Sequence, residues 1–359
     1  MSGQATTTAL SSTVFGELAD GTPVERWVLD DGTVRVAVLS YGGALHEITT
    51  PDRNDRRTDV SLGFDTLTGY LRPQPYLGAL IGRYANRIAA GRFALNGRTY
   101  RLEANDGRNH LHGGSGGFDK RVWSAEPITD GVRLALTSPD GDQGYPARLD
   151  VTVEYTLGAG NLRIAYAATN AEREGGPDTI VNLTNHCYFN LAGHGAGPIG
   201  DHVIEVPADR YAPSDAELIP TGALADVTGT PLDLRVPRAF SDGWDAAFEQ
   251  IANASGYDHS WLLDGVEPGR PVLAARVIHP DSGRVLEVMT DQPAIHVYSG
   301  NRMEHLPGAK GGQAYERRGG FCLETHHLPD SPNHPDFPST VLAPRQTFRS
   351  TTTYRFGTT

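Results

Sequence analysis

Residues 147–168 read ARLDVTVEYTLGAGNLRIAYAA and carry the clearest structural pattern in this chain of 359 residues. Alternation of apolar and polar side chains with a period of two is typical of a strand that buries one face. Two such runs joined by the short turn GAGN predict an antiparallel β-hairpin. The apolar members of the two runs are Leu149, Val151, Val153, Tyr155 and Leu157 before the turn, then Leu162, Ile164 and Tyr166 after it.

The same alternation recurs elsewhere in the chain. One run lies near the start, in VRVAVLSYGG, and two more flank the turn HPDSGR (279–284). Each run predicts a further strand with one buried face. The alternating residues are Val34, Val36 and Val38 in the first run and Leu273, Ala275 and Val277 in the second, and the third run begins at Val285.

One segment has the spacing of a helix instead. In SDGWDAAFEQIANA (241–254), Trp244, Phe248 and Ile251 recur at helical intervals. Ser241 and Asp242 precede them and are residue types that cap helix N-termini. The pattern predicts a short helix over this segment.

The sequence therefore predicts an all-β fold, a large antiparallel β-sandwich with few short helices. The 42 glycines and 24 prolines are spread along the chain, which favours many short segments joined by turns. No linker divides the chain, since EREGGPD (172–178) reads as a loop between similar strands. We expect a mobile tail over residues 1–10 and a single domain over residues 11–359.

Composition excludes several classes of partner. The formal net charge is −12 and no block of Lys or Arg stands out, which argues against nucleic acid and anionic membranes. No apolar run approaches the 18 residues of a membrane span, and the N-terminus lacks the pattern of a signal peptide. The two cysteines, Cys187 and Cys322, form no disulfide framework and are expected to be packing residues. We expect a cytoplasmic protein.

Five stretches carry more polar groups than folding requires: GRYANRI (82–88), NHLHGG (109–114), TNHCYFNL (184–191), GYDHSW (256–261) and LETHHLPDSPNHPDFPS (323–339). If TNHCYFNL is a strand, His186, Tyr188 and Asn190 share one face. A face with polar edges and an aromatic ring suits a sugar. The alternative is a structural histidine in the core.

The stretch FCLETHHLPD places Cys322, Glu324 and His326 on one face of a strand and Thr325 and His327 on the other. A glutamate between two apolar residues is rarely a plain surface residue if the strand is buried. The alternative is an edge strand with its glutamate in solvent.

The remaining stretches are more ambiguous. His110 and His112 would share a face if NHLHGG is extended, and the following glycines indicate a tight turn or a close approach of the backbone to a ligand. A metal motif built on two such histidines needs a nearby glutamate, which is absent, so we expect no metal. Arg87 also fits a surface ion pair, and Asp258 also fits a turn.

Taken together, and with SPDGDQGYP (138–146), these motifs resemble the aldose 1-epimerases, also called galactose mutarotases. The likeness runs from about Phe15 to Phe356, with the motifs in the family's order. It implies a β-supersandwich fold, no metal and no cofactor. It also implies interconversion of the α and β anomers of a hexose such as galactose or glucose, with a small-molecule aldose as the partner of a monomer or homodimer.

The resemblance also implies roles for individual residues. His186 matches the family's general acid, Glu324 its general base and His112 its second active-site histidine. Asn86, Arg87 and Asp258 match positions that hold sugar hydroxyls. His296 and His326 stand where the family usually has Gln, and we expect both to contact the substrate.

Mutarotation opens a cyclic hemiacetal, which requires a proton delivered to the ring oxygen and another removed from the anomeric hydroxyl. Free Glu titrates near pH 4.3 and free His near 6.5. We therefore expect Glu324 to be charged at neutral pH and His186 to be kept protonated by nearby carboxylates. Three rival functions are a glycoside hydrolase using Asp258 and Glu324, a sugar-binding module without catalysis, and a metal isomerase.

Overall fold

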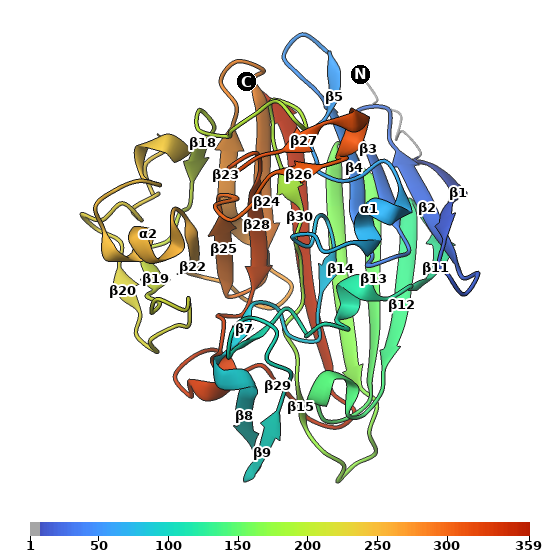
Figure 1. The fold of residues 1–359 in the computed structure, drawn as a ribbon, viewed down its shortest axis with the longest axis vertical. Coiled ribbons are helices and arrows are strands. Elements are labelled where there is room, and N and C mark those ends of the chain that lie inside the picture. The colour runs from blue at the N-terminus through green and yellow to red at the C-terminus, as the bar shows by residue number, and fades with distance from the viewer. Residues whose placement is uncertain (1–7) are drawn as a thin grey trace.

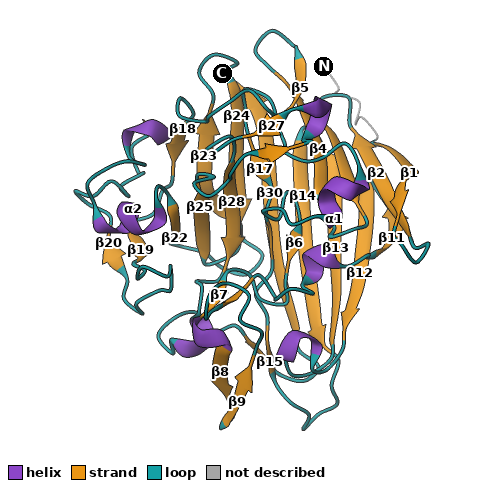
Figure 2. Cartoon of the chain, viewed as in Figure 1, coloured by secondary structure: helices purple, strands orange, loops and turns teal. Residues whose placement is uncertain are grey.

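The hairpin predicted from residues 147–168 forms the centre of the largest sheet of the protein. In the computed structural model, which describes residues 8–359, its strands β13 (Leu149–Gly158) and β14 (Asn161–Asn170) pair along their whole length. Strands dominate the residues that the structure describes, and the two α-helices among them, α1 (Leu67–Leu71) and α2 (Glu249–Ala254), are short (Figure 1, Figure 2). The prediction of an all-β, antiparallel fold is confirmed.

Three sheets make up most of the fold, and their neighbouring strands are antiparallel. The nine-stranded sheet has the order β11 (Ser124–Ile128), β12 (Gly131–Ser138), β13, β14, β30 (Thr347–Thr358), β24 (Arg284–Thr290), β23 (Val272–Ile278), β18 (Val203–Glu205) and β21 (Arg238–Ala239). The six-stranded sheet has the order β17 (Tyr188–Phe189), β28 (Phe321–His326), β25 (Ala294–Tyr298), β22 (Asp258–Leu262), β19 (Arg210–Ala212) and β20 (Ala225–Asp226). The five-stranded sheet has the order β1 (Ala9–Glu17), β2 (Pro23–Asp30), β3 (Arg35–Leu39), β4 (Leu45–Pro51) and β5 (Arg57–Asp59).

Short two-stranded ladders join the loops between these sheets. They pair β6 (Leu80–Ile81) with β16 (Thr184–Asn185), β7 (Arg87–Ile88) with β10 (His110–Leu111), β8 (Arg92–Leu95) with β9 (Arg98–Arg101), β15 (Thr179–Ile180) with β29 (Val341–Leu342), and β26 (Leu306–Pro307) with β27 (Ala314–Tyr315). Two of these ladders bring the predicted site segments 82–88, 109–114 and 184–191 into the fold.

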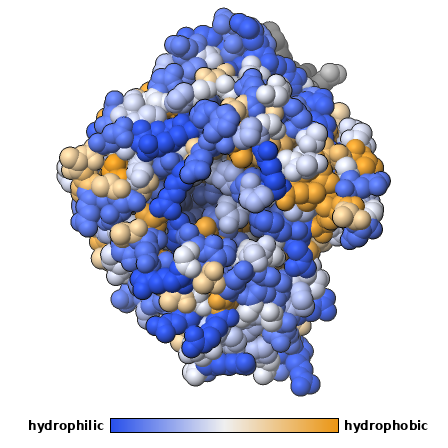
Figure 3. Space-filling model, in the orientation of Figure 1, coloured by the Kyte–Doolittle hydropathy of each residue, from blue (hydrophilic) through white to orange (hydrophobic). Residues whose placement is uncertain are grey.

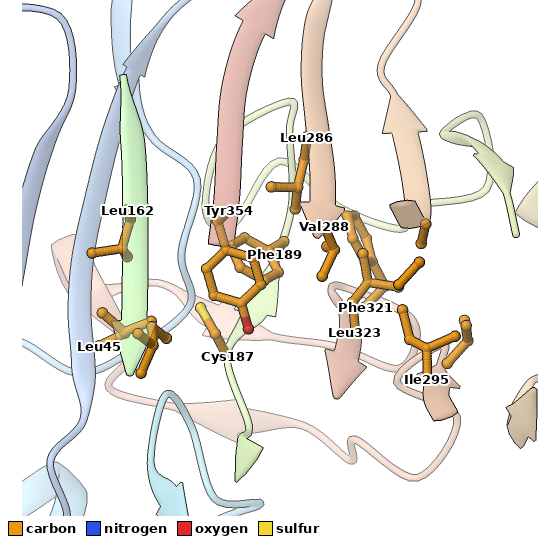
Figure 4. Packing of buried hydrophobic residues seen from close by; sticks show 14 of the residues in the cluster. Leu45, Leu162, Cys187, Phe189, Leu286, Val288, Ile295, Phe321, Leu323 and Tyr354 are labelled. Atoms are coloured by element: carbon orange, nitrogen blue, oxygen red, sulfur yellow. The ribbon is translucent and has the colours of Figure 1, made fainter. Parts of the chain in front are cut away.

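Strand β28 packs one face against the nine-stranded sheet. Phe321 and Leu323 lie in the same buried hydrophobic cluster as Val288 of β24 and Tyr354 of β30 (Figure 4). The hydroxyl groups of Thr325 and Thr352 share a hydrogen bond between β28 and β30. Because successive side chains of a strand point to opposite faces, Cys322, Glu324 and His326 are directed away from this core. The alternative of an edge strand is wrong, since β28 lies between β17 and β25.

Two predicted elements differ from the structure. TNHCYFNL is not one strand: the chain pairs with β6 at Thr184–Asn185, is unpaired at His186 and Cys187, and pairs with β28 at Tyr188–Phe189. The backbone groups of His186 bond instead to Ala79 and Gly78 in a separate loop. Asn190 lies beyond the end of β17 and outside the cavity lining, and its amide donates to the carbonyls of Gly197 and Gly319.

The helix predicted over 241–254 forms only in its second half, as α2, after a short 3₁₀ turn at Phe240–Asp242. Tertiary contacts override the helical spacing. The ring of Trp244 lies beneath the guanidinium of Arg318, 4.1 Å from it, and Phe248 keeps an extended backbone before α2 begins.

The predicted tail is too long. Residues 1–7 lie outside the described part of the chain, but β1 already begins at Ala9, and Ala9 and Leu10 pair with Asp30 and Leu29. The main hydrophobic cluster takes members from Trp27 to Tyr354, which supports our proposal of a single domain. No helix in the described residues is long and apolar enough to cross a membrane.

Replacing Phe321 by Ala should lower the free energy of unfolding by about 3–5 kcal/mol, because a fully buried ring leaves a cavity in the core. The ring contacts Phe189, Phe240 and His202, with centroids 5.4–5.9 Å apart. Denaturant unfolding measures the change. The control is V14A, which shortens a side chain that is 64% exposed and should change stability by less than about 0.5 kcal/mol. Similar losses in both variants would contradict the core assignment.

Candidate active site

A cavity of about 230 Å³ opens on the face of the six-stranded sheet that points away from the hydrophobic core. Figure 3 shows a hollow near the centre of this face with a mainly hydrophilic rim. The predicted site residues that line the cavity are Asn86, Arg87, His112, His186, Asp258, His296 and Glu324. A larger hollow of about 480 Å³ lies over β12–β14 and β30, but its lining includes no His or Glu.

His186 and Glu324 face each other across this cavity. Nε2 of His186 lies 3.6 Å from Oε1 of Glu324, and both side chains are almost fully buried. The other carboxyl oxygen of Glu324, Oε2, has no hydrogen-bond partner among the described residues. A buried oxygen without a partner is costly, so the geometry leaves this atom ready to bind a polar group of a ligand.

Burial controls the protonation of the pair. It lowers the pKa of His186 to about 4 and, with a further contribution from the charge of Asp258, raises the pKa of Glu324 well above its ordinary value. Desolvation outweighs the attraction of nearby carboxylates, so burial opposes the protonated form of His186 that we expected them to maintain. Burial thus opposes the charged form of each group.

Arg87 is held against the cavity wall by an acidic partner. Its Nε donates to Oδ2 of Asp106 at 2.8 Å, and only 8% of its side chain is exposed. Oδ1 of Asn86 accepts a hydrogen bond from the backbone N–H of Arg87 at 2.9 Å. Arg87 is thus a buried cation that lines the cavity rather than a surface residue.

Asn86 and His112 lock each other in unusual backbone conformations. Both have positive φ angles, 62° and 53°, which are uncommon for residues other than glycine. The N–H of Asn86 donates to Nδ1 of His112, and the N–H of His112 donates to the carbonyl of Asn86. Gly113 follows at φ 86°, where a Cβ atom would lie 1.9 Å from the carbonyl oxygen of Gly82. Of the two predicted roles of these glycines, a tight turn or a close approach to a ligand, Gly113 shows the turn, and its close approach is to the backbone of the protein.

His110 does not share a face with His112, contrary to expectation. The left-handed turn at His112 separates their directions. His110 is buried outside the cavity, where Nδ1 bonds to the carbonyl of Glu103 and Nε2 to the hydroxyl of Tyr145, both at 2.7 Å. Its role is structural.

Asp258 is the first residue of β22 and belongs to the cavity wall. Its Oδ1 accepts a hydrogen bond from Nε2 of His296 at 2.7 Å. Burial alone would raise the pKa of Asp258, but this bond and the charges of His296 and Arg87 lower it to about 2. Asp258 is therefore a buried, charged acceptor.

His326 is not in the cavity lining, so the structure corrects the expectation that it touches the substrate. Its ring lies parallel to that of His296, 5.7 Å away, and Nδ1 donates to the carbonyl of His327. The side chain is fully buried, and burial lowers its pKa to about 3. His326 supports the ring of His296 from behind.

Sequence reasoning placed Tyr188 on the face of His186 but missed other cavity residues, Tyr76 and Tyr298 among them. Tyr76 and Tyr188 contact the ring of His186, with centroids 5.8 and 5.1 Å away, and Tyr298 lies 6.5 Å away. Tyr298 follows His296 by two residues, so alternation along that strand could have identified it. Tyr76 lies in a loop with a φ of 59° and gave no such signal. Asp106 and Arg302 complete the polar part of the lining.

The donor atoms of His112, His186 and Glu324 lie within 4.8 Å of one another, the spacing of a possible metal site. The hydrogen bonds do not favour this use. The N–H of Asn86 points at Nδ1 of His112, so Nε2 of that ring carries its proton and neither nitrogen offers a free electron pair. The same holds for Asp201, His202 and His279, where Leu191 donates its N–H to Nε2 of His202.

The family profile described as aldose 1-epimerase matches residues 25–355. The chain belongs to the aldose 1-epimerase family. It is 44% identical to the galactose mutarotase of Bos taurus over 350 residues, which cover 97% of this chain and 99% of that protein. It is 37% identical to the aldose 1-epimerase of Escherichia coli K12 over 342 residues, or 94% of this chain and 96% of that protein.

The fold agrees with this assignment. The crystal structure of galactose 1-epimerase from Lactobacillus acidophilus NCFM superposes with a TM-score of 0.84 at 28% identity, covering 98% of this chain and 99% of that one. The resemblance inferred from the sequence motifs, and the supersandwich fold it implied, are confirmed.

The buried histidines predict an acid-sensitive fold. Burial lowers the pKa of His186 and His259 to about 4 and that of His326 to about 3, whereas the unfolded chain binds these protons near pH 6.5. Since the unfolded state then binds more protons, the free energy of unfolding should fall as pH falls from about 6.5 to 4. Glu324 acts in the opposite direction because its pKa is raised, and it offsets part of the loss.

Thermal unfolding followed by circular dichroism between pH 7 and 4.5 measures this dependence. The variant H326Q removes one of the three protons and should show a shallower decline than the unmodified protein. A melting temperature independent of pH across this range would show that these histidines are not buried in neutral form.

Proposed function

We propose that this protein interconverts the α and β anomers of a hexose such as D-galactose or D-glucose, with His186 and Glu324 as the proton-transfer pair. As a member of the family it is an aldose 1-epimerase, an isomerase that acts on an aldose. One observation carries the assignment of roles: an imidazole and a carboxyl group from distant parts of the chain face one cavity with their nearest atoms 3.6 Å apart.

The proton inventory of the pair fits ring opening. Ring opening uses the ion-pair form of the two groups: charged Glu324 accepts the proton of the anomeric hydroxyl while protonated His186 delivers a proton to the ring oxygen, so the pair passes to its neutral form. Burial favours that neutral form. The site therefore stabilises the protonation state that accompanies the open-chain aldehyde.

Reclosure reverses both transfers after the C1 group has turned. Glu324 returns a proton to the C1 oxygen, and His186 removes the proton of the hydroxyl group that becomes the ring oxygen. No covalent bond to the protein forms, and both residues return to their starting state. Each positioned proton-transfer group typically contributes about 10²–10⁴ in rate.

The rest of the lining suits a single sugar ring. We propose that Arg87, Asn86 and Asp258 bind hydroxyl groups, and that His112 contributes its Nε2–H. The tyrosine rings around His186 offer apolar surface to the faces of the sugar. A monomeric or homodimeric state and a cytoplasmic location remain predictions from the sequence.

Polarimetry of freshly dissolved α-galactose tests the proposed roles. The variants E324Q and H186N should each lower kcat by more than about a hundredfold, since each removes one proton-transfer group. E154Q, which changes a glutamate of β13 outside the cavity, is the matched control and should keep full activity. Thermal unfolding checks that the variants fold.

Other outcomes would reassign the residues. Activity retained in E324Q would exclude Glu324 as the base, and a change confined to KM in H186N would make His186 a binding residue. Sugar binding without faster change of optical rotation would identify a non-catalytic module. Release of nitrophenol from a nitrophenyl galactoside would favour a glycoside hydrolase.

A further inference from the structure

Ser260, His296 and Asp258 form a buried hydrogen-bonded chain beside the proposed proton-transfer pair. Strands β22 and β25 pair so that Ser260 lies opposite His296, and His296 in turn lies opposite Glu324 of β28. Nδ1 of His296 bonds to Oγ of Ser260 at 2.9 Å, and Nε2 bonds to Oδ1 of Asp258 at 2.7 Å. Ser260 and His296 are only 3% and 5% exposed.

The charge of Asp258 determines which group donates in its hydrogen bond with His296. Asp258 is charged, so its carboxylate only accepts, and Nε2 of His296 must carry the donated proton. Nδ1 of His296 bonds to the hydroxyl of Ser260, which has no other hydrogen-bond partner in the part of the chain that the structure describes. Both ring nitrogens are then used, and the imidazole has no polar atom left for a sugar.

We propose that His296 is a positioning residue that acts on the substrate only through Asp258. Its Nε2–H fixes Oδ1, which leaves Oδ2 of Asp258 without a hydrogen bond to the described residues and available to a sugar hydroxyl. Ser260 supports this arrangement by holding Nδ1 and so orienting the ring of His296. This inference rests on the proposed function in one respect: it takes Asp258 as a ligand of the sugar.

The inference revises the expectation that His296 itself binds the substrate. A residue that orients a binding carboxylate affects the bound sugar equally before and during the reaction, so its loss should appear in KM rather than in kcat. A hydrogen bond to a charged group is among the stronger ones in proteins, so the effect should be easily measured.

The test compares two replacements of His296 by polarimetry with α-galactose. H296M fills a similar volume without a donor and should raise KM by about tenfold or more while kcat changes less than about threefold. H296Q supplies an N–H to Asp258 and a carbonyl to Ser260, and should stay within about threefold of the unmodified protein in both constants. H327M, directly after β28 and outside the cavity lining, controls for loss of a partly buried imidazole and should change neither.

A double-mutant cycle tests whether His296 acts through Asp258. In a D258N background, the H296M change should raise KM by less than about twofold further, because the carboxylate that His296 positions is already gone. Galactose titration calorimetry in an E324Q background gives the same comparison without catalysis. There, E324Q/H296M should bind galactose about tenfold more weakly than E324Q.

Four results would overturn the inference. They are an unchanged KM in H296M, an H296Q variant as impaired as H296M, a fall in kcat with KM unchanged, and the full cost of H296M persisting in the D258N background. Failure of the proposed function has a different signature, since it shows as absent or Glu324-independent mutarotation while the calorimetric comparison still reports on His296.

Discussion

Alternation of side chains along β28 places core residues on one face of the strand and Glu324 on the other. Phe321 and Leu323 anchor the strand in the apolar layer between the two largest sheets, and this anchoring forces Glu324 into a buried position on the opposite face. A shift of one residue in the pairing of β28 would exchange these faces and place the carboxyl group in the hydrophobic core. The packing of Phe321 and Leu323 thus stabilises a buried position of the Glu324 carboxyl group, although this position removes it from water.

Burial also explains the electrostatics of the site. Arg87 and Asp258 are buried with hydrogen-bonded partners, Asp106 and His296, that compensate for lost water. Glu324 and His186 lack comparable partners, and each is displaced toward its neutral form. The cavity therefore separates two kinds of group: compensated ones suited to binding, and a poorly compensated pair suited to exchanging protons.

Much of this arrangement follows from period-two patterns. The hairpin at 147–168 and the shared face of Cys322 and Glu324 were predictable, because alternation along a paired strand directly determines which side chains lie together. The pattern failed where the backbone leaves the strand conformation. The positive φ at His112 turned His110 away, and the end of β17 at Phe189 separated Asn190 from its expected face.

Other misses have tertiary causes. His326 lies on the predicted face of β28, but it is outside the cavity lining, where its ring stacks beside that of His296. The apolar residues at helical spacing in 241–254 pack against different neighbours instead of forming one helix face. Trp244, for example, lies beneath Arg318. Tyr76 contributes a cavity wall from a loop, where no periodicity exists to reveal it. The protonation of His186 depended on a degree of burial that no local pattern reports.

The interlocked backbones of Asn86 and His112 have a thermodynamic consequence. Their unfavourable conformations are maintained by mutual hydrogen bonds before any sugar arrives, so the conformational entropy of this wall is lost during folding rather than during association. The strained conformations lower the stability of the folded protein, and the ligand binds more tightly because the wall is already ordered. A weakly binding monosaccharide, with few atoms to contribute, gains most from a wall that does not need to rearrange around it.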